Sequence, residues 1–453
     1  MKPTKRSTRR FRDPLRGRSP MAEGPFLLGQ RARLPNGARI VVARTPGLHS
    51  AMLALYVRVG SRHERPEANG ASHFVEHLLF RGSRGYPDSR AMNEAVEAAG
   101  GSMNAMTARD HTCFYTSLHP AGLETGIDVL ADLVRHPLLR DVEVERQVIL
   151  EEILDEVDSR GRDVDPDNLV KRIAFEGHGL GQKIAGTRGT VRALSEPALR
   201  AHHARHYTAA SVVLVAAGPV SFEEVVELAT PRLGALPRGL PPPVDPPPSW
   251  PAGPSVRAVE HDDAQVEFAL AFPAVPEPHR DHAVALVVRR LLDDGLSSRL
   301  PFEVIERHGL AYSVHAGLET FEDGGLFSFE GACTASRLER VADAIFRVAA
   351  SLWDGVLPEE ELARVKERHR MSLTFALDNP SELVGWFGTG ELFGNEETLE
   401  ERCRRVERVT SADVRRVARA MFRRRNLLAV VVGPGAPALR RALGRAIERS
   451  PLA

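Results

Sequence analysis

Two histidines and one glutamate lie within a five-residue stretch, HFVEH, at residues 73–77. In an α-helix, side chains four positions apart lie one above the other on the same face. His73 and His77 could therefore direct ring nitrogens at one metal ion about 2 Å away. Glu76 is too close in sequence to join them comfortably as a ligand, but it could hold a water molecule on the metal. The spacing predicts a zinc site of the H-x-x-E-H type. The alternative is a surface helix with incidental polar residues.

The residues around this motif have the pattern of an amphipathic helix. At about 100° per residue, they divide into two sides. One side carries His73, Glu76, His77 and Phe80. The other side is apolar and carries Phe74, Val75, Leu78 and Leu79. Gly82 is a suitable stop after such a helix. The two imidazoles are therefore expected to share a face with the carboxylate.

A catalytic zinc site usually has three protein ligands and one open position, so a third ligand must come from elsewhere. The candidates lie in a second predicted helix, DVEVERQVILEEILDEVDSR, at residues 141–160. Helical spacing groups Glu145, Glu152 and Glu156 on one side. This geometry does not choose between them, and a solvated acidic face is the alternative for any one. We expect another side of this helix to face the core; it carries Leu150, Ile153, Leu154 and Val157.

The composition is that of a globular chain without a charge preference. Of 453 residues, 43% are hydrophobic and 26% are charged, and the formal net charge is zero. This balance gives no whole-chain argument for binding nucleic acid or an anionic membrane. The three cysteines are far apart and form no CxxC, which argues against a disulfide framework and a cysteine-based zinc site. No uninterrupted apolar run approaches the length of a membrane span.

Proline content divides the chain. Residues 236–253 are rich in proline and predict an extended linker. It separates an N-terminal domain at 24–235 from a C-terminal domain at 254–453. Residues 1–23 are basic and lack the apolar stretch of a secretory signal; we expect a disordered tail and a cytoplasmic protein. The alternative for the tail is a nucleic-acid or targeting arm.

The periodicity of the sequence predicts both strands and helices in each half. Expected strands lie at 38–43, 50–61, 102–118 (a hairpin), 210–220, 264–275, 324–334 and 423–435. Expected helices lie at 89–101, 121–137, 141–160, 280–294 and 358–377. We therefore predict an α+β fold with two similar domains, each a mostly antiparallel sheet covered by helices.

Several motifs, in order, resemble the M16 metallopeptidases, the pitrilysin, insulinase and mitochondrial processing peptidase group. They are LPNGARIVV, VGSRHERPEANGASHFVEHLLFRGS, GGSMNAMTARDHT, ERQVILEE, GLGQKIAGT, HYTAASVVLVAAGPV and GLSSRLPFEVIERHGLAYSV. Together they cover most of residues 30–330. The joint pattern is far more specific than the five-residue motif alone.

The resemblance implies a zinc endopeptidase with one Zn²⁺ per chain. It selects Glu152 as the third ligand beside His73 and His77, and it makes Glu145 a supporting acid that orients the ligands. Glu76 would take a proton from the attacking water and pass it to the leaving amine. Substrates would be peptides or unfolded segments, because an extended chain is expected to pair with the strand edge that carries Asn104. The alternative for Asn104 is a strand-end turn.

The resemblance also implies a partner. In the family's second domain an Arg and a Tyr, seven positions apart, often bind substrate. Tyr312 fits the Tyr, but the Arg position holds Ile305. The alternative for Tyr312 is a packed aromatic residue after a turn. We therefore expect the zinc-bearing subunit of a homodimer or of a heterodimer with a homologous subunit.

Two alternative hypotheses remain for the function of the chain. It could be a non-catalytic structural or peptide-binding subunit, or a structural zinc protein. Non-catalytic relatives usually lose at least one of the residues at the metal site. All four matching residues are present here: His73, Glu76, His77 and Glu152. Structural zinc sites prefer four protein ligands rich in Cys, and these motifs contain none. The sequence therefore favours the enzyme.

Overall fold

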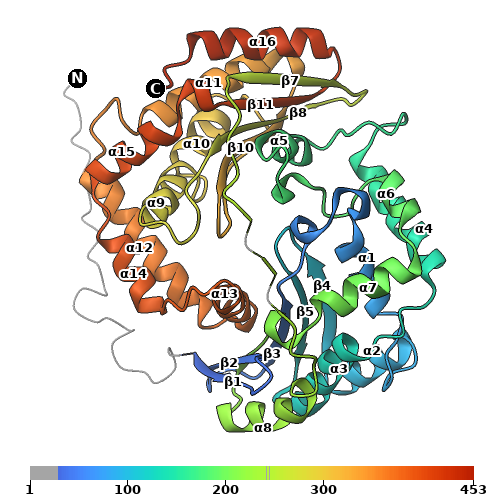
Figure 1. The fold of residues 1–453 in the computed structure, drawn as a ribbon. Helices are drawn as coiled ribbons and strands as arrows, with labels where there is room; N and C mark the ends of the chain where they lie inside the picture. Colours follow the sequence, from blue (N-terminus) through green and yellow to red (C-terminus); the bar gives the residue numbers. More distant parts are fainter. Residues whose placement is uncertain (1–28, 241, 244) are drawn as a thin grey trace.

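The structure is a computed structural model that describes residues 29–240, 242–243 and 245–453. The basic tail predicted at residues 1–23 lies outside the described residues. Figure 1 shows two lobes, each built around one β-sheet. In the part of the chain that the structure describes, no helix is long and apolar enough to cross a membrane.

The first lobe contains a sheet with the strand order β1-β2-β6-β3-β5-β4. Neighbouring strands run antiparallel, except that β2 and β6 are parallel. Strand β3 is buried along its whole length, whereas β4 lies at the edge and alternates between exposed and half-buried residues. The strands are β1 (Gln30–Arg33), β2 (Arg39–Arg44), β3 (Ala51–Val57), β4 (Ser102–Thr107), β5 (Thr112–Leu118) and β6 (Val212–Gly218).

The second lobe repeats this topology. Its strand order is β7-β11-β8-β10-β9, and only β7 and β11 run parallel. The parallel pair and the three strands that follow it match β2-β6-β3-β5-β4 one for one. Among the described residues, only β1 lacks a counterpart. The strands are β7 (Ser255–Glu260), β8 (Val266–Pro273), β9 (Ser313–Thr320), β10 (Gly325–Cys333) and β11 (Leu428–Gly433).

Helices of each lobe cover one face of its own sheet. In the first lobe, apolar residues of α1, α3, α7 and α8 pack with those of β2, β3 and β6 into one core. The helices are α1 (Ala71–Leu79), α2 (Ser89–Ala98), α3 (Leu123–Arg135), α4 (Val142–Glu152), α5 (Pro166–Ala174), α6 (Arg188–Ala193), α7 (Glu196–His206) and α8 (Phe222–Leu233). Ser, Thr or Asp caps begin several of them, as at α2 and α7.

The second lobe is covered in the same way, with α9, α11, α15 and α16 contributing to its core. Its helices are α9 (His282–Leu292), α10 (Arg299–Pro301), a π-helix (Phe302–Arg307), α11 (Leu338–Ala350), α12 (Glu359–Ala376), α13 (Pro380–Leu392), α14 (Leu399–Glu407), α15 (Ser411–Met421) and α16 (Ala436–Arg449).

The two halves exchange one helix each. Helix α13, from the C-terminal half, covers the other face of the first sheet, where Leu383 and Phe387 pack against β2, β3 and β6. Helix α5, from the N-terminal half, covers β8 and β11 of the second sheet with Leu169 and Val170. Figure 1 shows α13 beside the first sheet and α5 beside the second. Because each large buried apolar side chain contributes roughly 1.5–3 kcal/mol, this exchange ties the lobes together.

Ion pairs reinforce the contact between the lobes. Arg62, after β3, pairs with Asp323 in the β9–β10 turn at 2.6 Å, and the two side chains are only 6% and 4% exposed. Lys171 of α5 pairs with Glu319 of β9 at 2.6 Å. Buried charges of this kind are costly when one partner is removed, so the lobes are held in one relative placement.

The predicted fold class is confirmed: two sheet-and-helix lobes with mostly antiparallel strands. Between α8 and β7, residues 237–254 form neither helix nor strand wherever the structure describes them. One detail of the helix prediction was wrong. The α-helix ends at Glu152 and continues as a 3₁₀-helix, Ile153–Glu156. Its tighter winding changes the direction of the side chains, and Leu154 is 43% exposed rather than in the core.

Candidate metal centre

Helix α1 positions three polar side chains because its apolar side is anchored in the core. Phe74, Val75, Leu78 and Leu79 are each completely buried, as the 3.6-residue periodicity requires. This anchoring turns His73, Glu76 and His77 toward the opposite side, where all three are half-buried. The polar side of the helix therefore faces a partly shielded site.

The two imidazoles and one carboxylate of α4 converge. The Nε2 atoms of His73 and His77 lie 3.3 Å apart. An Oε2 atom of Glu152 lies 3.7 Å from the first and 3.6 Å from the second. Within the described residues, this is the one group of three His, Cys, Asp or Glu side chains whose ligand atoms all lie within 4.8 Å of one another.

These distances fit a tetrahedral zinc site. Ligand atoms about 2.1 Å from an ion, at a tetrahedral angle, lie about 3.4 Å from one another. The three measured separations are within a few tenths of an ångström of that value. Two imidazole nitrogens and one carboxylate oxygen are a donor set that zinc accepts. Glu152 is 46% exposed, so the centre is reached from solvent, which a site with an open position needs.

The other two glutamates of this region have different partners. Glu145 is buried, and its Oε2 atom lies 2.9 Å from Nδ1 of His77. Its other oxygen accepts a hydrogen bond from Arg81. Glu156 instead pairs with Lys183 at 2.7 Å. A carboxylate on Nδ1 leaves Nε2 of His77 free to face a metal, which is how such partners orient a ligating histidine.

The electrostatics of the ligands differ because their surroundings differ. Burial and the neighbouring His77 lower the pKa of His73 to about 4, so its imidazole is neutral near pH 7. Burial alone would lower the pKa of His77, but the hydrogen bond with Glu145 and the charge of Glu152 raise it. Burial would raise the pKa of Glu145, yet its bonds to His77 and Arg81 lower it.

Glu76 is held by the edge strand. Thr107, the last residue of β4, donates a hydrogen bond of 2.7 Å from its hydroxyl to Oε2 of Glu76. Burial raises the pKa of the Glu76 carboxyl, and the bond from Thr107 opposes this only in part. A carboxyl with a raised pKa is better suited to accept and return a proton near neutral pH.

Thr107 and Arg81 are site residues that the sequence reasoning missed. Arg81 follows His77 by four positions, so helical spacing could have placed it beside His77 and its carboxylate partner. Thr107 lies inside the quoted motif GGSMNAMTARDHT, but its contact depends on how β4 meets α1. This contact in space cannot be read from the order of the residues in the sequence.

Asn104 and Tyr312 form no hydrogen bond with the ligand cluster among the described residues. Asn104 lies exposed in β4, and its Oδ1 atom accepts a hydrogen bond from the Ala105 amide. Strand alternation places it on the sheet face of Tyr115, opposite the face of Thr107. Tyr312 is 87% exposed just before β9, so the alternative of a packed aromatic residue is wrong. Ile305 packs against the second core.

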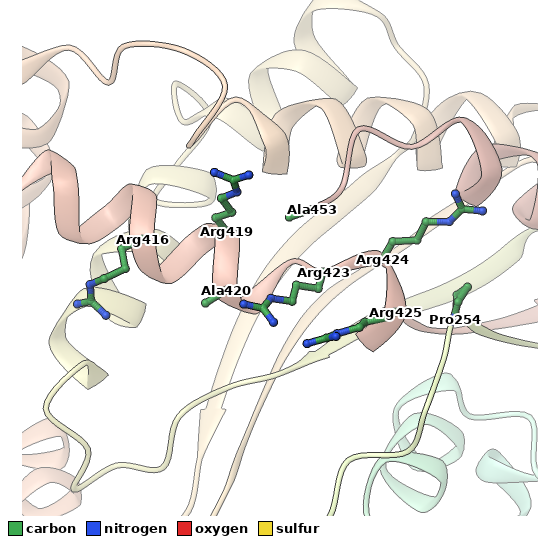
Figure 2. Close-up of a pocket in the computed structure, with 8 residues that line it drawn as sticks. All are labelled: Pro254, Arg416, Arg419, Ala420, Arg423, Arg424, Arg425 and Ala453. Carbon is green, nitrogen blue, oxygen red and sulfur yellow. The ribbon is translucent and has the colours of Figure 1, made fainter.

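A hollow of about 830 Å³ on the second lobe has a different character. It is lined by Pro254, Arg416, Arg419, Ala420, Arg423, Arg424, Arg425 and Ala453. Figure 2 shows Arg416 pointing away from the other arginines, where it pairs with Asp281 at 2.7 Å. The remaining guanidinium groups point in several directions rather than to one centre. The hollow therefore offers positive charge but no converging set of ligands.

Comparisons with known proteins identify the family of the chain. Residues 39–188 match the family model described as Insulinase (Peptidase family M16), and residues 193–368 match the Peptidase M16 inactive domain. The chain is 35% identical to an uncharacterized zinc protease of Mycobacterium tuberculosis, covering 92% of this chain and 96% of the relative. It is 31% identical to the mitochondrial-processing peptidase subunit beta of Blastocladiella emersonii, covering 89% and 88%.

A solved structure shows the same fold. A protease from Helicobacter pylori superimposes with a TM-score of 0.81 at 20% sequence identity, over 90% of this chain and 100% of the other. At this identity the likeness concerns the fold alone. The two family models and the identity to the mycobacterial relative carry the assignment, and by them the chain is a member of the M16 peptidase family, with one M16 domain and one M16 inactive domain.

Proposed function

We propose that this chain is a zinc-dependent endopeptidase with one Zn²⁺ held by His73, His77 and Glu152. The observation that carries the proposal is the convergence of three ligand atoms, 3.3 to 3.7 Å apart, beside a carboxylate that is not one of them. Relatives that are named zinc proteases support the choice of metal.

Each side chain has a separate role in hydrolysis. Zinc bound there supplies Lewis acidity for water activation and for polarising the scissile carbonyl. Glu76 accepts the proton of the attacking water and returns it to the leaving amine. Thr107 fixes the orientation of the Glu76 carboxylate through its 2.7 Å hydrogen bond. Glu145 fixes the His77 ring through Nδ1, the ring nitrogen that does not face the metal. Arg81 in turn binds Glu145.

The substrate is an extended or unfolded peptide segment. Strand β4 is the edge of the first sheet, and its last residue contacts Glu76. A peptide that pairs with the outer side of β4 would run past the metal centre, using backbone hydrogen bonds for affinity. Such binding requires a chain without structure of its own. Asn104 contacts the bound peptide near the cleaved bond, and its exposure in β4 supports this role.

The chain works with a second M16-type subunit, either a copy of itself or a homologue. Two observations support this. Ile305 is packed against the core, so its position offers no charged group to a substrate. One relative is by its name the beta subunit of a mitochondrial-processing peptidase. Tyr312 is the exposed side chain of the second lobe that would contact peptide.

The decisive experiment compares wild type with Glu76→Gln. Zinc content is measured by atomic emission and hydrolysis by cleavage of a fluorogenic, unstructured peptide. Glu94→Gln, in the exposed Arg90–Glu94 pair of α2, is the matched control. We expect Glu76→Gln to keep its zinc and lose at least about 100-fold in kcat, while Glu94→Gln behaves as wild type.

Two outcomes would contradict the proposal. Full activity in Glu76→Gln would remove that residue from the mechanism. Absence of zinc from the wild-type chain would favour a non-catalytic peptide-binding subunit instead. The partner is tested separately by measuring the oligomeric state and the activity of the purified chain alone; full activity of a monomer would end the case for a second subunit.

A further inference from the structure

The helix that carries the metal ligands begins without a cap of its own. Its N-cap residue is Gly70, which has no side chain to accept from the first turn, and no acidic residue lies in that turn. Gly70 has a left-handed backbone with φ of 99°, and a Cβ there would lie 2.7 Å from the Ala185 carbonyl oxygen. Ser, Asp or Asn, the usual caps, are therefore sterically excluded at this position.

A distant carboxylate takes over the capping. Glu64 is only 7% exposed, and its Oε1 atom accepts a hydrogen bond of 2.6 Å from the Ser72 amide. Its Oε2 atom accepts one of 2.7 Å from the Gly70 amide and one of 2.9 Å from the side chain of Asn69. A negative group at a helix N-terminus also interacts favourably with the helix dipole.

Glu64 and Asn69 also join the start of α1 to the segment 182–186. The side-chain amide of Gln182 donates to the backbone oxygen of Glu64 at 2.9 Å. The side chain of Asn69 donates to the Lys183 carbonyl at 2.7 Å as well as to Glu64. The start of α1 is thus fixed to a second backbone segment through Glu64 and Asn69.

Other helices show what is unusual here. At α2, Asp88 lies directly before the helix and caps the Ala91 amide three positions further on, and the contact is exposed. At α14, Thr398 does the same for Glu401. These local caps stabilise their own helix and nothing else. Glu64 is six to eight positions away from the amides that it accepts from, and it is buried.

We propose that Glu64 is a positioning residue for the metal centre, which sets the first turn of α1 so that His73 and His77 face one ion. This inference rests on the proposed zinc site. The reason is geometric: His73 follows Ser72 directly, and α1 has only nine residues. When the first turn frays, His73 loses its place relative to His77, and zinc must restore the turn before it binds both.

The change Glu64→Gln tests this directly. An amide group in place of one oxygen puts a donor against the Gly70 or Ser72 amide, which are donors too. Partners that orient a ligand typically contribute 10–100-fold in metal affinity, and we expect a loss of that size. The affinity for zinc is measured by competition with a chelator, and circular dichroism verifies that the variant is folded.

Asp88→Asn is the matched control, because it alters the N-terminal cap of a helix without ligands. Its zinc affinity should stay within about twofold of wild type. Substitution of zinc by Co²⁺ adds a measurement that does not depend on the overall stability of the protein. The visible bands of Co²⁺ report the ligand geometry, and they should change in Glu64→Gln but not in Asp88→Asn. If Glu64→Gln does not fold, Glu64→Asp and Asn69→Ala, each of which weakens the same cap, are measured in its place.

The outcomes separate this inference from the proposed function. If the wild type binds no zinc, both fail. If the wild type binds zinc and the folded Glu64 variants bind it with the same affinity and the same cobalt spectrum, Glu64 has only a structural role and the inference fails alone. Weaker zinc binding with an altered spectrum, and normal binding by Asp88→Asn, supports it.

Discussion

The two lobes have the same sheet topology, yet among the described residues only the first brings together three side chains that could hold a metal ion. The difference lies in equivalent helices. Helix α1 follows β3 and presents two histidines and a glutamate, whereas α9 follows the matching strand β8 and is largely buried and apolar. Helix α4 brings Glu145 and Glu152 to α1, while its counterpart α12 uses Glu361 to bind Arg299.

The comparison separates what the fold supplies from what the site needs. The repeated sheet supplies an edge strand, β4 or β9, and a helix after the third strand of the shared order. The proposed chemistry needs metal ligands on that helix and a carboxylate from a second helix of the same lobe. It also needs a hydrogen bond from the edge strand to the carboxylate that acts as the base. The second lobe keeps the scaffold and exchanges one helix with the first, so it supports the first sheet.

The sharpest way to break the comparison is to remove a ligand from the first lobe. His77→Ala leaves two ligand atoms and a buried Glu145 that keeps only its pair with Arg81. We expect zinc content to fall to near zero and peptide hydrolysis with it, because catalytic zinc needs three protein ligands. The control is His315→Ala, an exposed histidine of β9, which should keep full zinc. Retention of zinc by His77→Ala would show that the metal lies elsewhere.

The dependence of one lobe on the other is tested at their buried ion pair. Asp323→Ala leaves Arg62 buried, with only the longer contact to Asp245 at 3.4 Å. We expect the free energy of unfolding to fall by about 3–5 kcal/mol, as for a buried charge without its partner. Glu196→Gln, in an exposed pair with Arg200, should cost less than about 1 kcal/mol. Urea unfolding measures both, and equal costs would mean that the contact does not join the lobes.

The role of the supporting acid is tested by Glu145→Gln against Glu361→Gln. These residues lie on α4 and α12, the equivalent helices of the two lobes. Glu145→Gln weakens the bond to His77 and removes the ion pair with Arg81, so zinc affinity should fall by about 10–100-fold. Glu361→Gln breaks only the pair with Arg299. Chelator competition should show no change for it; an equal loss in both variants would point to stability rather than to ligand orientation.

The smallest effect concerns acid stability. Helix α7 carries three histidines, His202, His203 and His206, whereas the equivalent α15 carries none. Burial and Arg205 lower the pKa of His206 to about 4, from about 6.5 for a free imidazole. Between these values the unfolded chain binds a proton that the folded chain does not, so stability falls as the pH falls from 6.5 toward 4.

His206→Gln should therefore reduce the fall in the free energy of unfolding between pH 7 and 5, by an amount on the order of 1 kcal/mol. Arg419→Gln, on the exposed side of α15, should leave the slope unchanged. Thermal unfolding across this pH range measures both. A steeper slope in His206→Gln, or the same flattening in both variants, would contradict the assignment of the acid sensitivity to α7.

Much of the scaffold could be predicted from the sequence because local patterns determine it. The 3.6-residue periodicity gave both sides of α1, and alternation marked the hairpin of β4 and β5. The spacing of His73 and His77 predicted that their rings converge, and the two Nε2 atoms lie 3.3 Å apart. The choice among Glu145, Glu152 and Glu156 needed the family resemblance, because all three share one side of a helix.

Contacts between distant segments could not be predicted. Apolar side chains of α5 and α13 must be buried somewhere, but the sequence does not say that each helix covers the sheet of the other half. The bond from Thr107 to Glu76 depends on the meeting of β4 and α1. Tyr312 is exposed although an aromatic side chain usually buries much of its surface. A cytoplasmic location and the partner subunit remain predictions.

The central claim is that zinc is held by His73, His77 and Glu152 with one further position open. X-ray absorption at the zinc edge of the purified protein tests it most directly. We expect two imidazole nitrogens and carboxylate oxygen at about 2.0–2.2 Å, with one additional light ligand from solvent. Glu152→Ala should remove the carboxylate contribution from any zinc that remains. Sulfur at about 2.3 Å, or an unchanged spectrum in Glu152→Ala, would contradict the proposed centre.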